Sequence, residues 1–312
     1  AHKDTVLMLQ QTFPLVNVRN IMSCFDWLSN LVKPNPRKQP LRAKSTLTSI
    51  VVVEPRNKKV PSTQPSVTPV DSERATFQPK NPLQRSKRKG SKFRFEAAMH
   101  QIPHPEKRYK GGEDAGMAME NCLGVFDGVG GWAAFGVDPR EYSMSLCKHV
   151  CLAITEKKFT SPLKAMKNGY DKSVNITGSS TACVIMVSKD GKDMVAANLG
   201  DSGFIQLSRD GVVKCRSKPQ ESEFNTPWQL GTHSDDRPKD SDMYVVPLEE
   251  DDIIICGTDG LFDNLFDKHT LAYIKRGVAA GKTAKQLAIG LAEEAFRVSQ
   301  SVEVSPTFIC YN

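Results

Sequence analysis

The 312-residue sequence predicts an α+β fold in which antiparallel β-sheets are layered with pairs of helices. Several short apolar segments follow one another through Asp-Gly turns, which is typical of antiparallel hairpins. The helical segments occur in pairs and do not alternate with single strands, which argues against a parallel sheet. The hairpin segments are Ala182–Val187 and Met194–Leu199 around Asp190-Gly191, and Phe204–Leu207 and Val212–Cys215 around Asp210-Gly211.

The other elements of this fold follow in chain order. Phe93–Met99 alternates enough to form a first strand, and Cys122–Asp127 is an apolar run typical of a buried strand. Asp138-Pro139 and Ser161-Pro162 each indicate a helix start, because the first residue can cap the helix and proline suits its first turn. A buried strand at Asp252–Cys256 and helices at Asp267–Gly277 and Thr283–Ser299 complete the prediction.

The first 92 residues differ from the rest in charge and composition. They hold 17 Lys and Arg against 5 Asp and Glu, a net charge of +12, whereas residues 93–312 hold 25 against 30, a net charge of −5. Their many prolines, serines and threonines leave too little apolar surface to offset the entropy lost on ordering. We therefore expect residues 1–92 to be a basic, Pro/Ser-rich, largely disordered leader and linker, and residues 93–312 to be the folded domain.

The composition of the leader also bears on the compartment. A basic, Ser/Thr-rich and acid-poor segment is typical of organelle transit peptides, which predicts a mitochondrial or plastid location. The cluster Arg85-Ser86-Lys87-Arg88-Lys89 fits a nuclear signal, a nucleic-acid patch or a simple solvated charge run, so nuclear and cytoplasmic locations stay open. No aromatic residue interrupts that cluster, which argues against nucleic acid as a partner.

The eight cysteines are dispersed without a Cys-x-x-Cys pair, which favours a reducing compartment. No apolar run is long enough to span a membrane.

Acidic residues recur where apolar strands end. Asp127-Gly128 and Asp259-Gly260 each come directly after a buried strand, Glu113 follows two glycines, and Asp201 lies in a Gly-Asp-Ser-Gly turn. A buried carboxylate is costly unless it is paired or holds a cation, and glycine lets the backbone approach a ligand closely. Each motif alone is also an ordinary turn. Together, acids at neighbouring strand ends fit a pair of Mg²⁺ or Mn²⁺ ions, which can activate water and stabilise displacement at phosphorus.

Six motifs follow one another along the folded part of the sequence. They are Gly112-Glu113-Asp114, Asp127-Gly128-Val129-Gly130-Gly131-Trp132, Gly178-Ser179-Ser180-Thr181-Ala182, Ala197-Asn198-Leu199-Gly200-Asp201-Ser202-Gly203-Phe204, Phe224-Asn225-Thr226-Pro227 and Thr258-Asp259-Gly260-Leu261-Phe262-Asp263-Asn264. In this order they resemble the metal-dependent Ser/Thr phosphatases of the type 2C (PPM) family. Within that family they look like the branch that includes the mitochondrial phosphatase Tc-seven. The resemblance covers roughly residues 93–306, and six ordered motifs are far more specific than one.

The resemblance implies a four-layer sandwich of two antiparallel sheets flanked by helix pairs. It implies a monomeric enzyme that hydrolyses phosphoprotein monoesters with a metal-activated water and two Mg²⁺ or Mn²⁺ ions per active site. The residues it implies are Asp127, which bridges the two ions, the Gly128 carbonyl and Asp259 as ligands, Glu113 for metal-bound water, Asp201 and Asp263 for a weaker third ion, and Arg108, or alternatively Lys110, for the substrate phosphate.

Two departures from the family pattern leave other functions open. Val129 stands where many members have a histidine that acts as a general acid. No carboxylate follows Glu303, so we expect this chain to lack one metal ligand and the C-terminal strand. The alternative is therefore a catalytically impaired pseudophosphatase that acts as a binding or scaffold protein. A nucleic-acid binder that uses residues 85–92 is a third, less favoured function.

Overall fold

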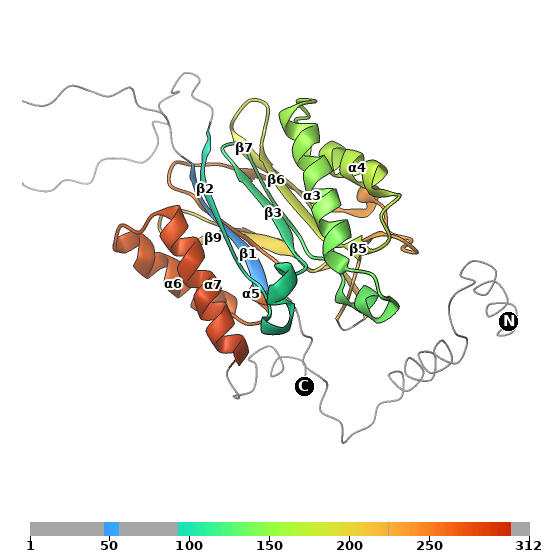
Figure 1. The fold of residues 1–312 in the computed structure, drawn as a ribbon. Helices are drawn as coiled ribbons and strands as arrows, with labels where there is room; N and C mark the ends of the chain where they lie inside the picture. The colour runs from blue at the N-terminus through green and yellow to red at the C-terminus, as the bar shows by residue number, and fades with distance from the viewer. Residues whose placement is uncertain (1–46, 56–92, 224, 301–312) are drawn as a thin grey trace, which may run out of the picture. The chain divides into compact units, whose positions relative to one another are not determined.

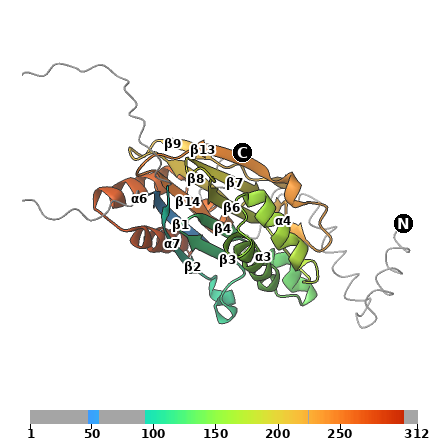
Figure 2. The same cartoon turned by 90° about the horizontal axis from the view of Figure 1, so that it is seen from above.

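Two antiparallel sheets lie face to face, and a pair of helices covers the outer side of each (Figures 1 and 2). The structure, a computed structural model, describes residues 47–55, 93–223 and 225–300. Residues from both sheets share one buried apolar cluster, which includes Leu123, Ile185 and Ile254. Two further clusters join each sheet to its own helices. The four-layer α+β sandwich predicted from the sequence is confirmed.

The first sheet contains five strands in the order β2-β1-β14-β8-β9. Every neighbouring pair is antiparallel, with Ile255 of β14 opposite Ile205 of β8. Its strands are β1 (Leu47–Pro55), β2 (Phe95–Ile102), β14 (Ile253–Gly257), β8 (Gly203–Leu207) and β9 (Val213–Arg216).

The second sheet also has five strands, in the order β13-β7-β6-β4-β3, and all its pairs are antiparallel. The predicted hairpin around Asp190-Gly191 joins β6 to β7 and is confirmed. Edge strand β13 was not predicted, because its side chains alternate between half-buried and exposed. The strands are β13 (Asp242–Pro247), β7 (Asp193–Leu199), β6 (Ala182–Val187), β4 (Cys122–Phe126) and β3 (Ala115–Met119).

The helices begin where the capping signals predict. The Asp138 carboxylate accepts from the Arg140 N–H at 3.1 Å, and the Ser161 hydroxyl accepts from the Lys164 N–H at 3.4 Å. Each cap satisfies a backbone donor that has no partner within its helix. Helices α3 (Pro139–Thr155) and α4 (Pro162–Ser173) cover the second sheet, and α6 (Asp267–Ala279) and α7 (Ala284–Gln300) cover the first.

Strand β1 corrects the domain boundary expected at residue 92. Residues 47–55 pair with β2 along their length and with β14 through Val51 opposite Cys256, so they form an interior strand of the first sheet. The β-branched run Ile50-Val51-Val52-Val53 suits an extended strand. The rest of the expected leader and residues 301–312, which bear on the expected loss of a C-terminal strand, lie outside the described residues.

Short elements at the strand ends shape the surroundings of the site. They are the 3₁₀ helices η1 (Pro105–Lys110), η2 (Gly130–Phe135) and η3 (Pro238–Asp240), the helical turn α5 (Asp259–Phe262), and the short strands β5 (Ser179–Ser180), β10 (Glu221–Glu223), β11 (Thr226–Pro227) and β12 (Leu230–Gly231). Within the described part of the chain, no helix has both the length and the apolar character needed to cross a bilayer.

Candidate metal centre

Asp127 lies directly after β4, where the chain leaves the second sheet. Its N–H donates to Thr181 Oγ1 at 3.2 Å, and its carbonyl accepts from the Thr181 N–H at 3.0 Å. Two residues on, the Val129 N–H donates to the Ser179 carbonyl at 3.0 Å. These bonds hold the backbone around Asp127 against the neighbouring segment, so the carboxylate is presented from a fixed strand end.

Gly128 is required by the close approach of three segments at this corner. A Cβ atom at this position would lie 2.5 Å from the Pro139 carbonyl oxygen and 2.7 Å from the Glu113 carbonyl oxygen, closer than atoms can approach. Gly128 also forms an isolated antiparallel bridge with Ser180. The absence of a side chain therefore lets the start of α3 and the segment around Glu113 meet the corner that carries Asp127.

Asp259 approaches the same place from the first sheet. It begins α5, immediately after Thr258 at the end of β14. The Thr258 hydroxyl donates to Asp114 Oδ2 at 3.1 Å, which ties this strand end to the segment around Glu113. The two carboxylates predicted to form the centre therefore come from different sheets, and the charge of Asp127 acts on Asp259.

The electrostatics of this group are those of desolvated like charges. Burial raises the pKa of Asp127 well above its usual value, and the charges of Asp114 and Asp201 raise it further. Burial also raises the pKa of Asp259 well above normal, with Asp127, Asp201 and Asp263 adding to the effect. Crowded carboxylates with raised pKa values gain from a bound cation, because the cation offsets their mutual repulsion.

The group fits a divalent cation by charge and burial. Asp259 Oδ1 is buried and has no hydrogen-bond partner among the described residues, so this acceptor is unused. Hard ions such as Mg²⁺ and Mn²⁺ prefer carboxylate and carbonyl oxygens, which Asp127, Asp259 and Gly128 offer. However, no three His, Cys, Asp or Glu side chains of the described residues are already arranged around a common point as a ligand set.

The raised pKa values predict how metal-free protein responds to pH. The pKa of Asp201 rises from its usual 3.8 to about 7, through burial first and then through the charges of Asp263 and Glu221. Between these two values the unfolded chain is ionised while the folded chain keeps its proton, so stability falls as pH rises. We expect the melting temperature in EDTA to fall by roughly 5 °C from pH 5 to pH 8.

Saturating Mn²⁺ should reverse this trend, because cation binding requires the ionised carboxylates. Scanning fluorimetry at both pH values, with EDTA or Mn²⁺, measures the effect. Asp201→Asn serves as the control, because it removes one titrating group and should flatten the slope in EDTA. A metal-free melting temperature that rises between pH 5 and pH 8 would contradict the prediction.

Glu113 is held by two lysines of η1. It is only 2% exposed, and Lys107 forms an ion pair with it. Lys110 Nζ lies 2.9 Å from Glu113 Oε1 and 2.8 Å from Asp138 Oδ1. Burial alone would lower the pKa of Lys110, but its hydrogen bonds and charge interactions with Asp138 and Glu113 outweigh burial and raise it. Two ammonium groups therefore lie beside a buried carboxylate at the edge of the centre.

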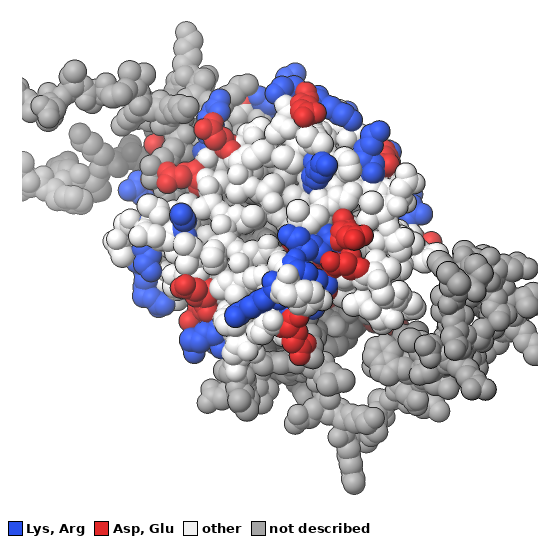
Figure 3. Space-filling view, in the orientation of Figure 1, with Lys and Arg blue, Asp and Glu red and all other residues white. Residues whose placement is uncertain are grey.

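Arg108 lies away from this group. Its guanidinium carbon is 5.4 Å from the centre of the Phe296 ring on α7, so the structure does not bring this predicted phosphate ligand to the carboxylates. Lys107 and Lys110, the second of which is the alternative phosphate ligand, lie beside the Glu113 carboxylate instead. In Figure 3 Lys and Arg side chains gather beside acidic ones where η1 lies in Figure 1.

Asp201 and Asp263, predicted to hold a weaker third ion, interact with each other and with Glu221 of β10. The pKa of Asp263, which remains open to solvent, rises to about 6 through partial burial and then the charge of Glu221. Asp201 also raises the pKa values of Asp127 and Asp259. The structure thus places Asp127, Gly128 and Asp259 at one corner, with the Glu113 backbone against Gly128 and with Asp201 and Asp263 beside the pair.

Sequence reasoning missed three residues that contribute to this site. Asp114 was noted beside Glu113 but given no role. Lys107 could have been found only with the backbone conformation of Gly111 and Gly112, which both have φ +82° and turn the chain back toward Glu113. Glu221 lies in an exposed three-residue strand that no local pattern marks.

The chain matches a known protein family over about half of its length. The Protein phosphatase 2C family matches residues 134–293, which is 160 of the 312 residues. Probable protein phosphatase 2C 55 of Arabidopsis thaliana is 40% identical over 184 residues, which cover 57% of this chain and 38% of that protein. The PTC7 homolog of Danio rerio is 36% identical over 190 residues, covering 56% of this chain and 64% of that protein. The chain therefore spans less than two thirds of either relative.

A solved structure gives the same result for the fold. The photosystem II phosphatase PBCP superposes with a TM-score of 0.62 at 31% sequence identity, and the match covers 67% of this chain and 83% of that one. The motifs, the sandwich, the family match and the PTC7 homologues all indicate the same assignment. The chain belongs to the protein phosphatase 2C family.

Proposed function

We propose that this chain hydrolyses phosphoserine and phosphothreonine monoesters in proteins with the help of Mg²⁺ or Mn²⁺. The observation that carries the proposal is the half-buried Asp127–Asp259 pair, whose pKa values are raised and whose buried Asp259 Oδ1 has no partner among the described residues. Such perturbed acids in one place are typical of functional sites. Family membership adds that the homologues bear the name protein phosphatase.

The roles of the chain's own residues follow from their positions. Asp127 would bridge two cations, Asp259 and the Gly128 carbonyl would complete their contacts, and Glu113 would orient water at the edge. Asp201 and Asp263 would hold a weaker third cation. Bound divalent ions supply a lowered pKa for water and charge stabilisation at the phosphoryl group. No histidine is present at Val129, so the leaving group would take its proton from solvent or another side chain.

A phosphate assay tests the proposal. Full-length protein should release phosphate from p-nitrophenyl phosphate and from phosphoserine peptides only when Mn²⁺ or Mg²⁺ is present, and EDTA should abolish release. Metal-independent release, or release that persists in EDTA, would contradict it.

A pseudophosphatase is the second candidate, favoured by the absence of a ready three-acid ligand set among the described residues. It predicts that Mn²⁺ binds, as measured by calorimetry, but that no substrate is turned over at saturating metal. An organellar location, implied by the basic N-terminal composition, is a further prediction that fractionation of tagged protein can test.

Lys110 should contribute to binding of the phosphate group. Its ammonium lies beside Glu113 at the edge of the centre, where an anion would approach, while Arg108 stacks over Phe296. We expect Lys110→Met to raise KM for p-nitrophenyl phosphate about tenfold, because a charge-assisted contact is lost. Arg108→Met is the matched control and should leave KM within about twofold. Equal effects of the two variants would contradict the assignment.

A further inference from the structure

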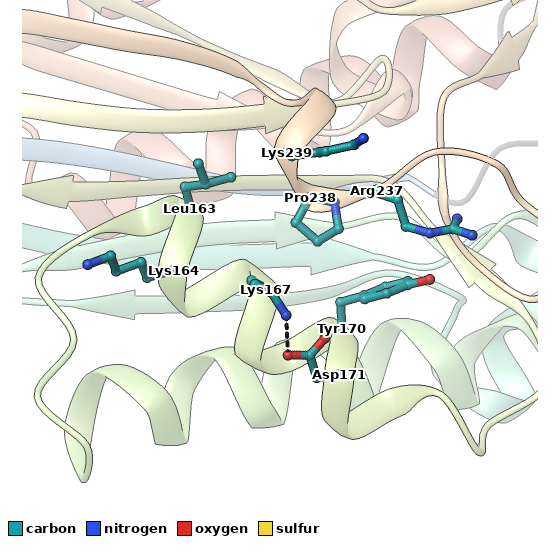
Figure 4. Close-up of a pocket in the computed structure, with 8 residues that line it drawn as sticks. All are labelled: Leu163, Lys164, Lys167, Tyr170, Asp171, Arg237, Pro238 and Lys239. Carbon is teal, nitrogen blue, oxygen red and sulfur yellow. Dashed lines mark hydrogen bonds and ion pairs between the residues drawn. The ribbon is translucent and has the colours of Figure 1, made fainter.

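A cavity of about 450 Å³ opens between α4 and η3 (Figure 4), and none of the metal-centre carboxylates lines it. Helix α4 forms one wall and the loop of η3 forms the other. We call it the α4–η3 groove. Its lining residues are Leu163, Lys164, Lys167, Tyr170, Asp171, Arg237, Pro238 and Lys239.

The groove carries more positive than negative charge. Four of its lining residues are cations and only Asp171 is an acid. Lys167 forms an ion pair with Asp171 at 2.6 Å, and the Arg237 guanidinium lies 5.9 Å from the centre of the Tyr170 ring. Lys164 and Lys239 are exposed, and neither makes an ion pair with another described residue. Two ammonium groups are thus available on opposite walls.

Two of the acids that flank η3 accept from nearby backbone donors. Asp236 Oδ2 accepts from the Gln229 N–H at 2.9 Å, and Asp240 Oδ2 accepts from the Arg237 N–H at 2.8 Å. Both carboxylates therefore satisfy local backbone donors. Their hydrogen bonds fix the loop in the shape that forms one wall of the groove.

An exposed apolar stripe lies on edge strand β13, which begins two residues after η3. The residue before this strand, Ser241, donates to Met166 Sδ of α4 at 3.3 Å, so the stripe starts beside the helix that forms one wall of the groove. Met243 is 46% exposed and Val245 is 66% exposed. Met243 lies opposite Ala197, which belongs to the cluster that packs under α3 and α4, so the stripe faces the same side of the sheet as α4. Large exposed apolar side chains beside a charged groove are typical of a protein-binding surface.

We propose that the α4–η3 groove and the adjoining stripe bind an acidic peptide segment with apolar side chains, carried by the protein substrate. The groove's cations select for acidic residues, and Leu163, Met243 and Val245 offer apolar contacts. The identity of the partner as a substrate rests on the proposed phosphatase function, whereas the peptide binding does not.

A continuous series of hydrogen bonds joins the groove to the metal-centre corner. Trp132 Nε1, five residues after Asp127, donates to Ser179 Oγ at 2.6 Å, and Ser179 Oγ donates to Gln229 Oε1 at 2.5 Å. The Gln229 N–H donates to Asp236, whose carbonyl accepts from Arg237 Nη1 at 2.8 Å. A peptide held in the groove is therefore bound to a loop that is tied to η2 and β5, which border the site.

Binding is tested first, without turnover. A fluorescein-labelled, unphosphorylated peptide with glutamates around a Leu-Phe pair should bind the full chain, more weakly as salt rises. The double variant Lys164→Glu/Lys239→Glu should bind about tenfold more weakly. Lys189→Glu/Lys285→Glu, which makes the same charge change at exposed positions elsewhere, should bind as wild type. A lysine peptide of the same length should not bind.

Kinetics then connect the groove to the substrate. For a phosphoserine peptide extended by the glutamate segment, Lys164→Glu/Lys239→Glu should raise KM about tenfold and leave kcat unchanged. Turnover of p-nitrophenyl phosphate should stay at the wild-type rate. If no variant turns over any substrate but the binding difference persists, the phosphatase function fails and the peptide site stands.

Three results would overturn the peptide site. The wild type could fail to bind the glutamate peptide, both double variants could bind it equally well, or binding could be insensitive to salt. Vesicles containing phosphatidylserine are the remaining comparison. If Lys164→Glu/Lys239→Glu abolished binding to such vesicles but not to the peptide, the groove would be a membrane contact.

Discussion

Asp127→Asn should reduce Mn²⁺-dependent phosphate release at least about thousandfold, which corresponds to roughly 4 kcal/mol of lost transition-state stabilisation. Asparagine has nearly the same shape but removes the charge that two cations would share. The same change relieves repulsion among buried carboxylates, since the charges of Asp114 and Asp201 raise the pKa of Asp127. We therefore expect the metal-free variant to melt at a higher temperature than the wild type. The substitution would then raise stability while it lowers activity, as is common for changes at functional sites.

Activity is expected to fall while the melting temperature rises, so a loss of catalysis can be distinguished from a loss of folding. Phosphate release and melting temperature in EDTA are measured on the same preparation. Asp190→Asn is the matched control, because Asp190 also precedes a glycine but lies exposed in the β6–β7 hairpin. It should keep wild-type turnover. If Asp127→Asn kept a tenth or more of the wild-type rate at saturating Mn²⁺, Asp127 would not be a bridging ligand.

Removal of β1 should destabilise the domain as a whole. Residues 44–312 are expected to unfold cooperatively, whereas residues 93–312 should lose the cooperative transition or melt more than about 10 °C lower. Strand β1 lies between β2 and β14, so its removal takes away the only sheet partner that edge strand β2 has among the described residues and leaves one side of β14 with unpaired backbone groups. Helix α7, which packs over β1 and β2, would lose part of its support.

A single substitution in β1 and the addition of a β1 peptide test the role of this strand further. Val52 pairs with both Ala98 and Ile255, so Val52→Pro removes a backbone donor in the interior of the sheet and should cost about 3 kcal/mol or more. A synthetic peptide of residues 44–57 should restore the cooperative transition when added to residues 93–312. Equal melting temperatures for the two truncated chains would show that β1 is dispensable.

The sequence predicted the elements whose signals are local. The capping residue itself predicts the helix starts at Asp138-Pro139 and Ser161-Pro162. The dipeptide Asp190-Gly191 alone predicts its hairpin. Strand β1 has a local signal too, a β-branched run, but it is surrounded by prolines and lysines. Its pairing depends on β2, 40 residues later, and on β14, 200 residues later, as the Cα partners Pro55–Phe95 and Val53–Ile254 show. Local composition cannot reveal such partners.

The candidate site also combines residues that a local signal predicts with residues that no local signal predicts. The acids at strand ends could be found because a carboxylate beside glycine after an apolar run is a local anomaly. The sequence could not show which basic residue lies beside these acids, because that depends on the turn at Gly111 and Gly112. That turn directs Lys107 and Lys110 toward Glu113, while Arg108, between them in sequence, points to Phe296. Spacing alone cannot distinguish the three cations.

The origin of Asp127 and Asp259 in different sheets has a consequence for the whole domain. A cation bound to both would act as a reversible cross-link between the two halves of the sandwich, at a point where their apolar interface ends. Any motion that separates the ends of β4 and β14 would then require the cation to leave first. Chelation would thus loosen the joint between the sheets as well as stop the reaction, and metal supply would set how often the domain opens at that end.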